Sequence, residues 1–220
     1  MVLDGEVAAT DANGNVDFES IMERFSLRKS DKIRQAAKDR PVNYIVFDIL
    51  RLKGVDLRGL PLYKRKEILS DIDLGNPYIA KIPFLEEEGQ RLYDEIKSRG
   101  MEGIVAKHNN SIYVSSRSEA WQKIINWTYV DVFITGYRKK EFGWLVAVEE
   151  KPGKLRPAGM VELGVTPKQR MAFYQVKDAL MTSEDDKFVY LEPRIKGRIK
   201  TRNWTKAGLL RSPAFAEFLL

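Results

Sequence analysis

The decapeptide "MEGIVAKHNN", residues 101–110, places a carboxylate and an amine at the two ends of one short apolar segment. Glu102 comes just before Gly-Ile-Val-Ala, and Lys107 comes just after it. A run of this length and type is consistent with a buried β-strand, which would carry Glu102 at its start and Lys107 at its end. The two charged groups could then border one pocket. The same pattern also describes an ordinary strand with solvated ends, and the decapeptide alone does not separate the two interpretations.

The absence of cysteine and the presence of a single histidine limit the catalytic chemistry that the chain could perform. The sequence has no cysteine, which excludes disulfides, thiolate nucleophiles and cysteine-based zinc sites and suits a reducing cytoplasm. Any Ser-His-Asp triad would have to use the single histidine, His108, for which a solvated surface position is the simpler interpretation. Catalysis would therefore depend on Lys, Asp, Glu, Tyr and metal ions held by oxygen.

The charge of the chain predicts a polyanionic partner. Lys and Arg number 37 against 31 Asp and Glu, which gives a net charge of +6. Basic residues concentrate in "RIKGRIKTRNWTK", residues 194–206, around a tryptophan. Such side chains displace counterions from phosphates, and an aromatic ring can pack on a sugar or base. We expect Arg198, Lys200 and Arg202 to contact DNA, although a solvated basic strand would have the same composition.

The hydrophobic pattern predicts a protein with helices and strands and no membrane partner. No apolar run approaches the eighteen or so residues of a membrane span, and the N-terminus has no basic leader or apolar signal core. In the first half we expect a turn over 11–15 and a mixture of strands and helices. Asp17 is expected to be the N-cap of the first helix. The strands are expected over 2–9, 42–50, 78–84 and 103–107, and the helices over 17–25, 29–40, 63–72 and 86–100.

The pattern changes after Trp127, where short strands dominate. Strands are expected over 130–137, 143–150, 155–163 and 187–201, with one helix over 166–181. Several strands and one helix in about ninety residues are typical of a small Greek-key barrel such as an OB-fold. The fold class is therefore α+β, with a domain at 1–128 and an OB-fold domain at 129–220.

Five segments stand in order along the chain: "LDGEVA", "YIVFDILRLKGVDLRGLPLYKRKEIL", "MEGIVAK", "SEAWQKIINW" and "GLLRSPAF". Together they resemble the motif series of ATP-dependent DNA ligases, members of the covalent nucleotidyltransferase superfamily, and most of all the short bacterial end-joining type. The resemblance covers nearly the whole chain. It implies an incomplete adenylation domain at 1–128, an OB-fold that lies on nicked or broken duplex DNA, and use of ATP and Mg²⁺. It also implies repair or recombination in a bacterial cytoplasm, at the nucleoid, beside an end-joining polymerase or end-binding proteins.

The resemblance also implies roles for single residues. Glu6 would accept a hydrogen bond from a ribose hydroxyl, and Phe47 would stack on adenine unless it only packs in the strand core. Glu102 would help to hold Mg²⁺ at the α-phosphate. Lys107 would contact phosphate, and Lys123 would point at the α-phosphate.

The sequence also departs from the family pattern. A second lysine is expected two residues after Lys123, where this chain has Ile125, and Trp121 is expected to belong to the core. The nucleophilic lysine of a Lys-x-Asp-Gly motif, expected upstream of "LDGEVA", is absent, and the chain ends before the family's Arg-x-Asp-Lys. We therefore expect a ligase fragment that cannot adenylylate itself.

The alternative is a catalytically silent DNA-binding or scaffold fragment. An RNA ligase or capping enzyme is a third possibility, against which "GLLRSPAF" argues. Loss of the front of the domain would leave strand edges unpaired, which predicts self-association.

Overall fold

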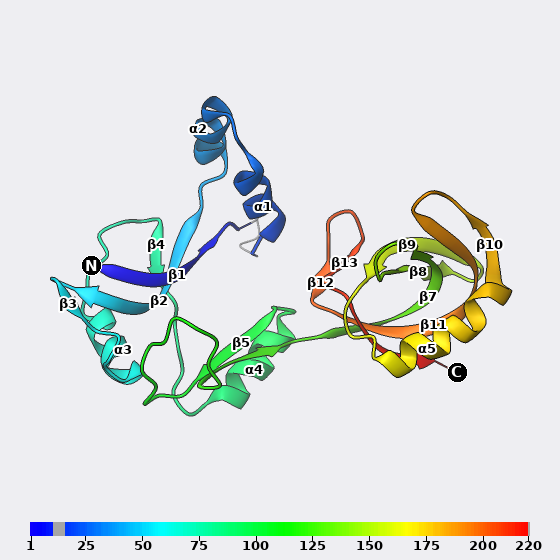
Figure 1. Cartoon of the computed structure of the whole chain (residues 1–220). Coiled ribbons are helices and arrows are strands. Elements are labelled where there is room, and N and C mark those ends of the chain that lie inside the picture. The colour runs from blue at the N-terminus through cyan, green and yellow to red at the C-terminus, as the bar shows by residue number, and fades with distance from the viewer. Residues whose placement is uncertain (11–15, 220) are drawn as a thin grey trace. The chain divides into compact units, whose positions relative to one another are not determined.

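The computed structural model describes residues 1–10 and 16–219 (Figure 1). The chain divides into two compact units, each of which is described by itself. The first unit comprises Met1–Asp94 and Ile104–Ile124, and the second comprises Glu95–Gly103 and Ile125–Leu220. The domain boundary at Tyr129 remains a prediction. Among the described residues, no helix is long and apolar enough to cross a membrane.

The first unit is built on a four-stranded sheet whose centre is the longest of its strands, β2. Antiparallel partners β1 and β3 lie beside β2, and β4 pairs with it in parallel. The bounds are β1 Val2–Ala8, β2 Asn43–Leu52, β3 Val55–Asp56 and β4 Ile79–Lys81. The prediction of a central strand from the apolar run at 42–50 is confirmed, because β2 has β1 on one side and β3 and β4 on the other.

Helix α3 covers part of this sheet and closes a small core. The helix runs over Leu62–Ser70, and its Leu69 packs with Val46, Ile49 and Leu57. Gly5 lies in β1 at an irregularity of its pairing with β2, where the two backbones pass close together. A Cβ at this position would lie 2.6 Å from the carbonyl oxygen of Ile45, so only glycine fits.

Two short helices follow β1. Helix α1 (Phe18–Ser26) begins at Asp17, whose carboxylate accepts a hydrogen bond from the Ser20 amide at 3.1 Å, as the sequence predicts for an N-cap. Helix α2 (Ser30–Asp39) comes next. The turn predicted at 11–15 lies outside the described residues. The predicted elements at 63–72, 78–84, 86–100 and 103–107 are all found, as α3, β4, α4 (Gly89–Ser98) and β5 (Gly103–Lys107). Strand β5 pairs with β6 (Trp121–Ile125) in a two-stranded sheet.

The second unit is dominated by a six-stranded antiparallel sheet in the order β10-β11-β7-β8-β9, with β14 also paired to β11. Its strands are β7 Thr128–Arg138, β8 Trp144–Lys151, β9 Lys154–Val161, β10 Met181–Glu184, β11 Phe188–Thr201 and β14 Ala214–Leu219. The early part of β11 pairs with β10 and the late part with β14, while β7 runs beside both parts. Among the described strands no ladder joins β9 to β10, but a parallel bridge between Leu163 and Ala214 links the segment after β9 to the start of β14, where the Phe215 amide donates to the Leu163 carbonyl at 2.8 Å.

One helix and one aromatic core complete this unit. Helix α5 (Pro167–Val176) starts at Thr166 with a reciprocal capping box to Gln169, and a short 3₁₀ turn follows at Lys177–Leu180. Trp144 is the centre of the core and contacts the rings of Phe173 and Phe215 at centroid distances of 4.8 and 5.1 Å. A small two-stranded sheet joins β12 (Asn203–Trp204) to β13 (Leu210–Arg211). The α+β composition predicted from the sequence is confirmed.

Candidate functional site

Three segments of the first unit converge on one amine. The ammonium nitrogen of Lys107, at the end of β5, lies 3.6 Å from the ring centroid of Trp121 on β6 and 4.4 Å from that of Phe47 on β2. The two rings meet edge to face, with centroids 6.5 Å apart. We call Phe47, Lys107 and Trp121 the aromatic–lysine cluster. An ammonium beside the faces of two rings is held by their quadrupoles, and Trp is the strongest partner.

The structure corrects the expectation for Trp121. Sequence reasoning placed this side chain in the core, but it is half-buried, belongs to neither hydrophobic core, and packs against Lys107, Phe47 and Tyr113. Its indole NH donates to the Ser111 hydroxyl at 3.3 Å. Trp121 is therefore part of the candidate site.

Two further predicted residues, Lys123 and Glu6, lie on the same strand faces as residues of the aromatic–lysine cluster. Lys123 follows Trp121 by two residues on β6, so both side chains leave the strand on the same side. Ile125 shares that side and is half-buried, where the family pattern has a cation. Glu6 on β1 pairs with Ile45, which stands two residues before Phe47 and shares its face of β2. Both Glu6 and Lys123 are exposed and reachable by a ligand.

The environment of Lys107 changes its chemistry. Burial lowers the pKa of its ammonium group to about 8, with the nearby Lys66 acting in the same direction and the carboxylate of Asp48 opposing both. Burial likewise lowers the pKa of Lys66. A lysine of this kind is a mixture of ammonium and free amine near neutral pH, so it can bind an anion or exchange a proton.

A buried ion pair supports the strand that carries Phe47, and sequence reasoning missed it. Asp48 and Arg65 have fully buried side chains joined by two hydrogen bonds of 2.8 Å. The other guanidinium nitrogen of Arg65 donates to the carbonyls of Leu60 and Ser111. The signal was present in the sequence, because a carboxylate inside an apolar run needs a buried partner. The pair fixes β2, α3 and the segment before β6 together.

The region around Asp4 provides a second contact across the first unit. The hydroxyl of Tyr113 donates to the Asp4 carboxylate at 2.9 Å, and the hydroxyl of Tyr44 donates to the Leu3 carbonyl at 3.1 Å. Burial, and then the hydrogen bond to Asp4, raises the pKa of Tyr113. These contacts anchor β1, and with it Glu6, to the segment that leads to Trp121.

Glu102 belongs to the second unit and is already paired. One carboxylate oxygen accepts from Arg202 at 2.5 Å and the other from Arg211 at 3.0 Å. A carboxylate that binds Mg²⁺ must offer it an oxygen that is not neutralised by cations, and such sites use one or two carboxylates together with substrate phosphates and water. Among the described residues no group of three or more His, Asp or Glu side chains could hold a metal ion. The residues around Glu102 therefore do not fit Mg²⁺ as they stand.

Within the basic segment at residues 194–206, arginine side chains are paired with carboxylates, which reduces the positive charge that the sequence indicates. Arg198 makes a two-pronged contact with Asp131 and also reaches Glu217, and Arg202 pairs with Glu102. Lys200 lies over the ring of Trp127, with its nitrogen 5.1 Å from the centroid. The DNA contacts predicted for these three residues stay predictions, and Lys200 is the one whose charge the structure offers most directly.

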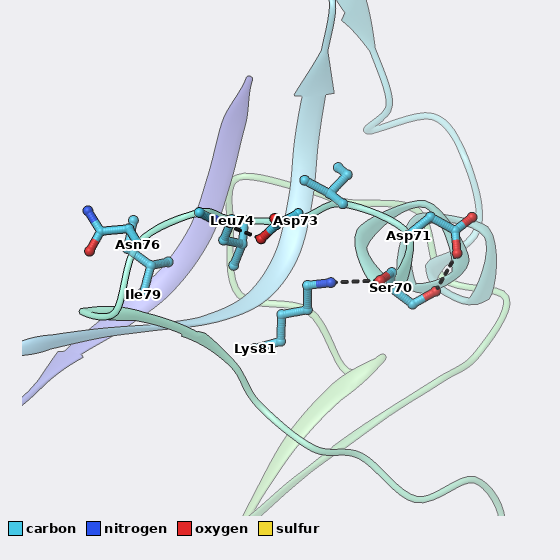
Figure 2. Close-up of a pocket in the computed structure, with 9 residues that line it drawn as sticks. Ser70, Asp71, Asp73, Leu74, Asn76, Ile79 and Lys81 are labelled. Carbon is cyan, nitrogen blue, oxygen red and sulfur yellow. Dashed lines mark hydrogen bonds between the residues drawn. The ribbon is translucent and has the colours of Figure 1, made fainter.

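A separate hollow lies in the first unit between the end of α3 and β4 (Figure 2). Lys81 reaches across it and donates to the Ser70 carbonyl at 2.7 Å, while the Asp73 carboxylate accepts from the Gly75 amide. None of the predicted site residues lines it. Its polar groups satisfy the local turn, so it is distinct from the aromatic–lysine cluster.

Comparisons with known proteins identify the family. Residues 1–124 match the family described as "ATP dependent DNA ligase domain". The chain belongs to the ATP-dependent DNA ligase family. Its relatives include the SPbeta prophage-derived DNA ligase-like protein LigB of Bacillus subtilis (strain 168), 35% identical over 218 residues, which cover 99% of this chain and 75% of that protein.

Longer relatives match this chain over only part of their own length. The bifunctional non-homologous end joining protein LigD of the same organism is 29% identical over 230 residues, and the match covers 99% of this chain and 37% of LigD. A solved Lig E DNA ligase, studied for DNA binding with a minimal scaffold, superposes with a TM-score of 0.65 at 18% identity. The alignment covers 99% of this chain and 76% of that ligase, and it supports a shared fold.

Proposed function

We propose that this chain is the adenylate-binding and DNA-binding part of a ligase that seals nicks or ends in duplex DNA. The observation that carries the proposal is the aromatic–lysine cluster, which joins Phe47, Lys107 and Trp121 within one unit of a chain of this family. Flat apolar rings beside an ammonium suit a ligand that has a purine at one end and phosphate at the other.

In this proposal the groups have separate tasks. Phe47 stacks on the adenine, Lys107 and Lys123 bind the phosphate, and Glu6 accepts from a ribose hydroxyl. Phosphoryl transfer depends mainly on positioning and on neutralising charge at the transferring group. Ile125 supplies no charge where the family pattern has a lysine, so we expect slow transfer. Glu102 forms ion pairs with two arginines, so the proposal includes no step that depends on Mg²⁺.

The second unit is proposed to be an OB-type fold that lies on the DNA backbone. Support comes from its six-stranded antiparallel sheet, the single helix α5 between β9 and β10, and the basic residues of β11. An OB-fold is a partly open Greek-key barrel, which agrees with a sheet whose edges, among the described residues, meet only at the bridge between Leu163 and Ala214. The partners proposed for the whole assembly are nicked or broken duplex DNA and, as in end joining, a polymerase or end-binding protein.

The decisive experiment uses a nicked duplex that already carries AMP on its 5′-phosphate. This substrate bypasses the attack of a protein lysine on ATP, so the full chain should seal it. Phe47→Ala should weaken binding of the adenylylated nick about 5- to 150-fold, because one base–aromatic stack is worth about 1–3 kcal/mol. Lys107→Met should slow sealing, whereas Lys38→Met, an exposed lysine on α2, should leave it unchanged.

Two outcomes would replace the proposal. Tight binding of nicked duplex without any sealing would support the alternative, a catalytically silent DNA-binding fragment. Sealing of nicked RNA in preference to nicked DNA would support an RNA ligase. Equal sealing by wild type and Phe47→Ala would show that the ring does not hold the adenine.

A further inference from the structure

Lys66 is a half-buried lysine on the side of α3 that packs into the first unit. It follows Leu62 by four residues and precedes Leu69 by three, so its side chain leaves the helix on the side where these two leucines are buried. Lys64, two residues earlier, is exposed and forms an ion pair with Glu67 at 2.9 Å. Neighbouring lysines of one helix therefore have different surroundings, and only Lys66 is directed inward.

A backbone hydrogen bond holds α3 against the segment that follows Lys107. The Tyr63 amide, in the first turn of α3, donates to the Asn109 carbonyl at 3.1 Å. Tyr63 precedes Lys66 by three residues, which places the two on one side of the helix. Asn109 follows Lys107 by two residues. The end of β5 and the first two turns of α3 therefore bring Lys66 into the neighbourhood of the aromatic–lysine cluster.

Neither of these two ammonium groups is neutralised by a carboxylate. Among the described residues, no Asp or Glu forms an ion pair or hydrogen bond with Lys66 or Lys107. The nitrogen of Lys66 lies 4.5 Å from the ring centroid of Phe84, and that of Lys107 lies against the two rings of the cluster. Ring faces attract a cation but carry no net charge. The Asp48 carboxylate acts on both lysines, but Arg65 already binds both of its oxygens.

The two like charges oppose each other in a place that is partly shielded from water. Burial lowers the pKa of Lys66, and burial together with the charge of Lys66 lowers the pKa of Lys107. Both shifts reflect the cost of keeping an ammonium charged at these positions. An anion bound by both groups would remove the repulsion and accept charge-assisted hydrogen bonds from them. The arrangement is therefore that of an anion site with two cations.

We propose that Lys66 is a second phosphate-binding residue of the site and acts together with Lys107 on the phosphate of the adenylate. The ring of Phe47 beside Lys107 identifies the anion, because a flat ring suits a purine and the phosphate is attached to that purine nucleoside. The proposal rests on the proposed function. It gives the phosphate a second ammonium group from α3 in a chain whose Ile125 supplies none.

The experiment separates the phosphate from the adenine. The full 220-residue chain and its variants are titrated with AMP and with adenosine, and binding is followed by NMR. The ratio of the two dissociation constants measures the contribution of the phosphate alone. Lys66→Met should reduce the preference for AMP about tenfold, because it removes a hydrogen bond to a charged group. Adenosine binding should stay unchanged.

Two matched variants control for charge and position. Lys64→Met removes an exposed lysine from the same helix and should leave the preference for AMP as it is in the wild type. Lys66→Arg keeps a positive charge at the site and should retain most of the preference.

A stability measurement distinguishes phosphate binding from packing on Phe84. Methionine keeps an unbranched apolar side chain against the ring and removes one of the two opposing charges. Without ligand, the urea midpoint of Lys66→Met should therefore equal or exceed that of the wild type. A lower midpoint with an unchanged preference for AMP would overturn the proposal, because Lys66 would then serve only to pack on Phe84.

A nicked duplex that carries no AMP tests whether Lys66 contacts the DNA instead. Lys66→Met should weaken AMP binding more than binding of this duplex. The opposite result, weaker duplex binding with an unchanged preference for AMP, would overturn the proposal.

Pyrophosphate separates failure of this inference from failure of the proposed function. If neither adenosine nor AMP binds, the adenylate site is refuted, and pyrophosphate then tests the two lysines without a base. Pyrophosphate binding that Lys66→Met weakens and Lys64→Met does not would keep the anion site and refute only the proposed function. Binding of AMP and adenosine with the wild-type ratio in Lys66→Met would keep the proposed function and refute the role of Lys66. Absence of any anion binding that depends on Lys66 would refute both.

Discussion

The buried pair of Asp48 and Arg65 is predicted to determine the stability of the first unit. Arg65→Leu removes two 2.8 Å hydrogen bonds and leaves the Asp48 carboxylate without its cation in a position that is 0% exposed. Removing one partner of a buried pair costs about 3–5 kcal/mol, because the other charge stays desolvated. Such a loss is a large part of the about 5–15 kcal/mol that stabilises a domain.

The assay is urea unfolding followed by circular dichroism. At an m-value of about 2 kcal/mol/M, the expected loss lowers the midpoint of the first unit's transition by about 1.5–2.5 M. The double variant Asp48→Leu, Arg65→Leu should recover much of this loss, since no charge then remains buried. The exposed pair of Arg58 and Asp56 has the same fork geometry, and Arg58→Leu should change the midpoint far less.

Two results would refute this reasoning. If Arg65→Leu unfolds at the wild-type midpoint, the pair does not hold β2 and α3 together. If the double variant is as unstable as Arg65→Leu, the cost comes from the lost contacts of Arg65 with the Leu60 and Ser111 carbonyls and not from an unpaired Asp48.

Four further predictions follow from single positions. Gly5→Ala should destabilise the first unit in the same urea assay, because its Cβ would clash with a carbonyl oxygen of β2 at 2.6 Å. Between about pH 8 and 10.5 the free energy of unfolding should rise with pH, since the unfolded Lys107 keeps a proton that the folded form has lost, and Lys107→Met should flatten this slope in unfolding curves. Lys200→Ala should reduce the salt dependence of duplex binding by about 0.9 in log affinity against log salt, and an unchanged slope in a fluorescence titration would count against a phosphate contact. Intact-mass measurement after incubation with ATP and Mg²⁺ should show no added AMP on this chain alone, and an adduct on Lys107 would contradict that expectation.

The sequence predicted those helices and strands whose signals depend on residues close together in the chain. The cap at Asp17, the apolar run before Phe47 and the alternating strands of the second half each depend on neighbours a few residues away, and each element was found. The pairing of β3, β12, β13 and β14 was not predicted. These strands have two to six residues, too few for a clear alternating pattern, and each exists because a partner strand supplies its hydrogen bonds: β2 for β3, β11 for β14, and β12 and β13 for each other.

The candidate site was predictable in its residues and not in its contacts. Phe47 and Lys107 could be named from motifs, and the structure brings them together through Trp121, which the sequence placed in the core. Burial of a tryptophan depends on what packs against its strand. Here the neighbour is the ammonium of Lys107, whose position follows from the pairing of β5 with β6 and not from spacing along the chain.

The ion pairs show why the sequence alone overstates how many charges are available to bind a ligand. Residues 194–206 form a basic run, yet Arg198 is neutralised by Asp131, 67 residues away, and by Glu217. Glu102 appears free beside Lys107, yet Arg202 lies 100 residues away in sequence and binds it. Exposed pairs of this kind contribute little to stability, but each one removes a charge that a phosphate or a metal ion would otherwise use. A ligand that reaches Glu102 or Arg198 must therefore exchange one ion pair for another, and this competition, more than the count of charges, would set its affinity.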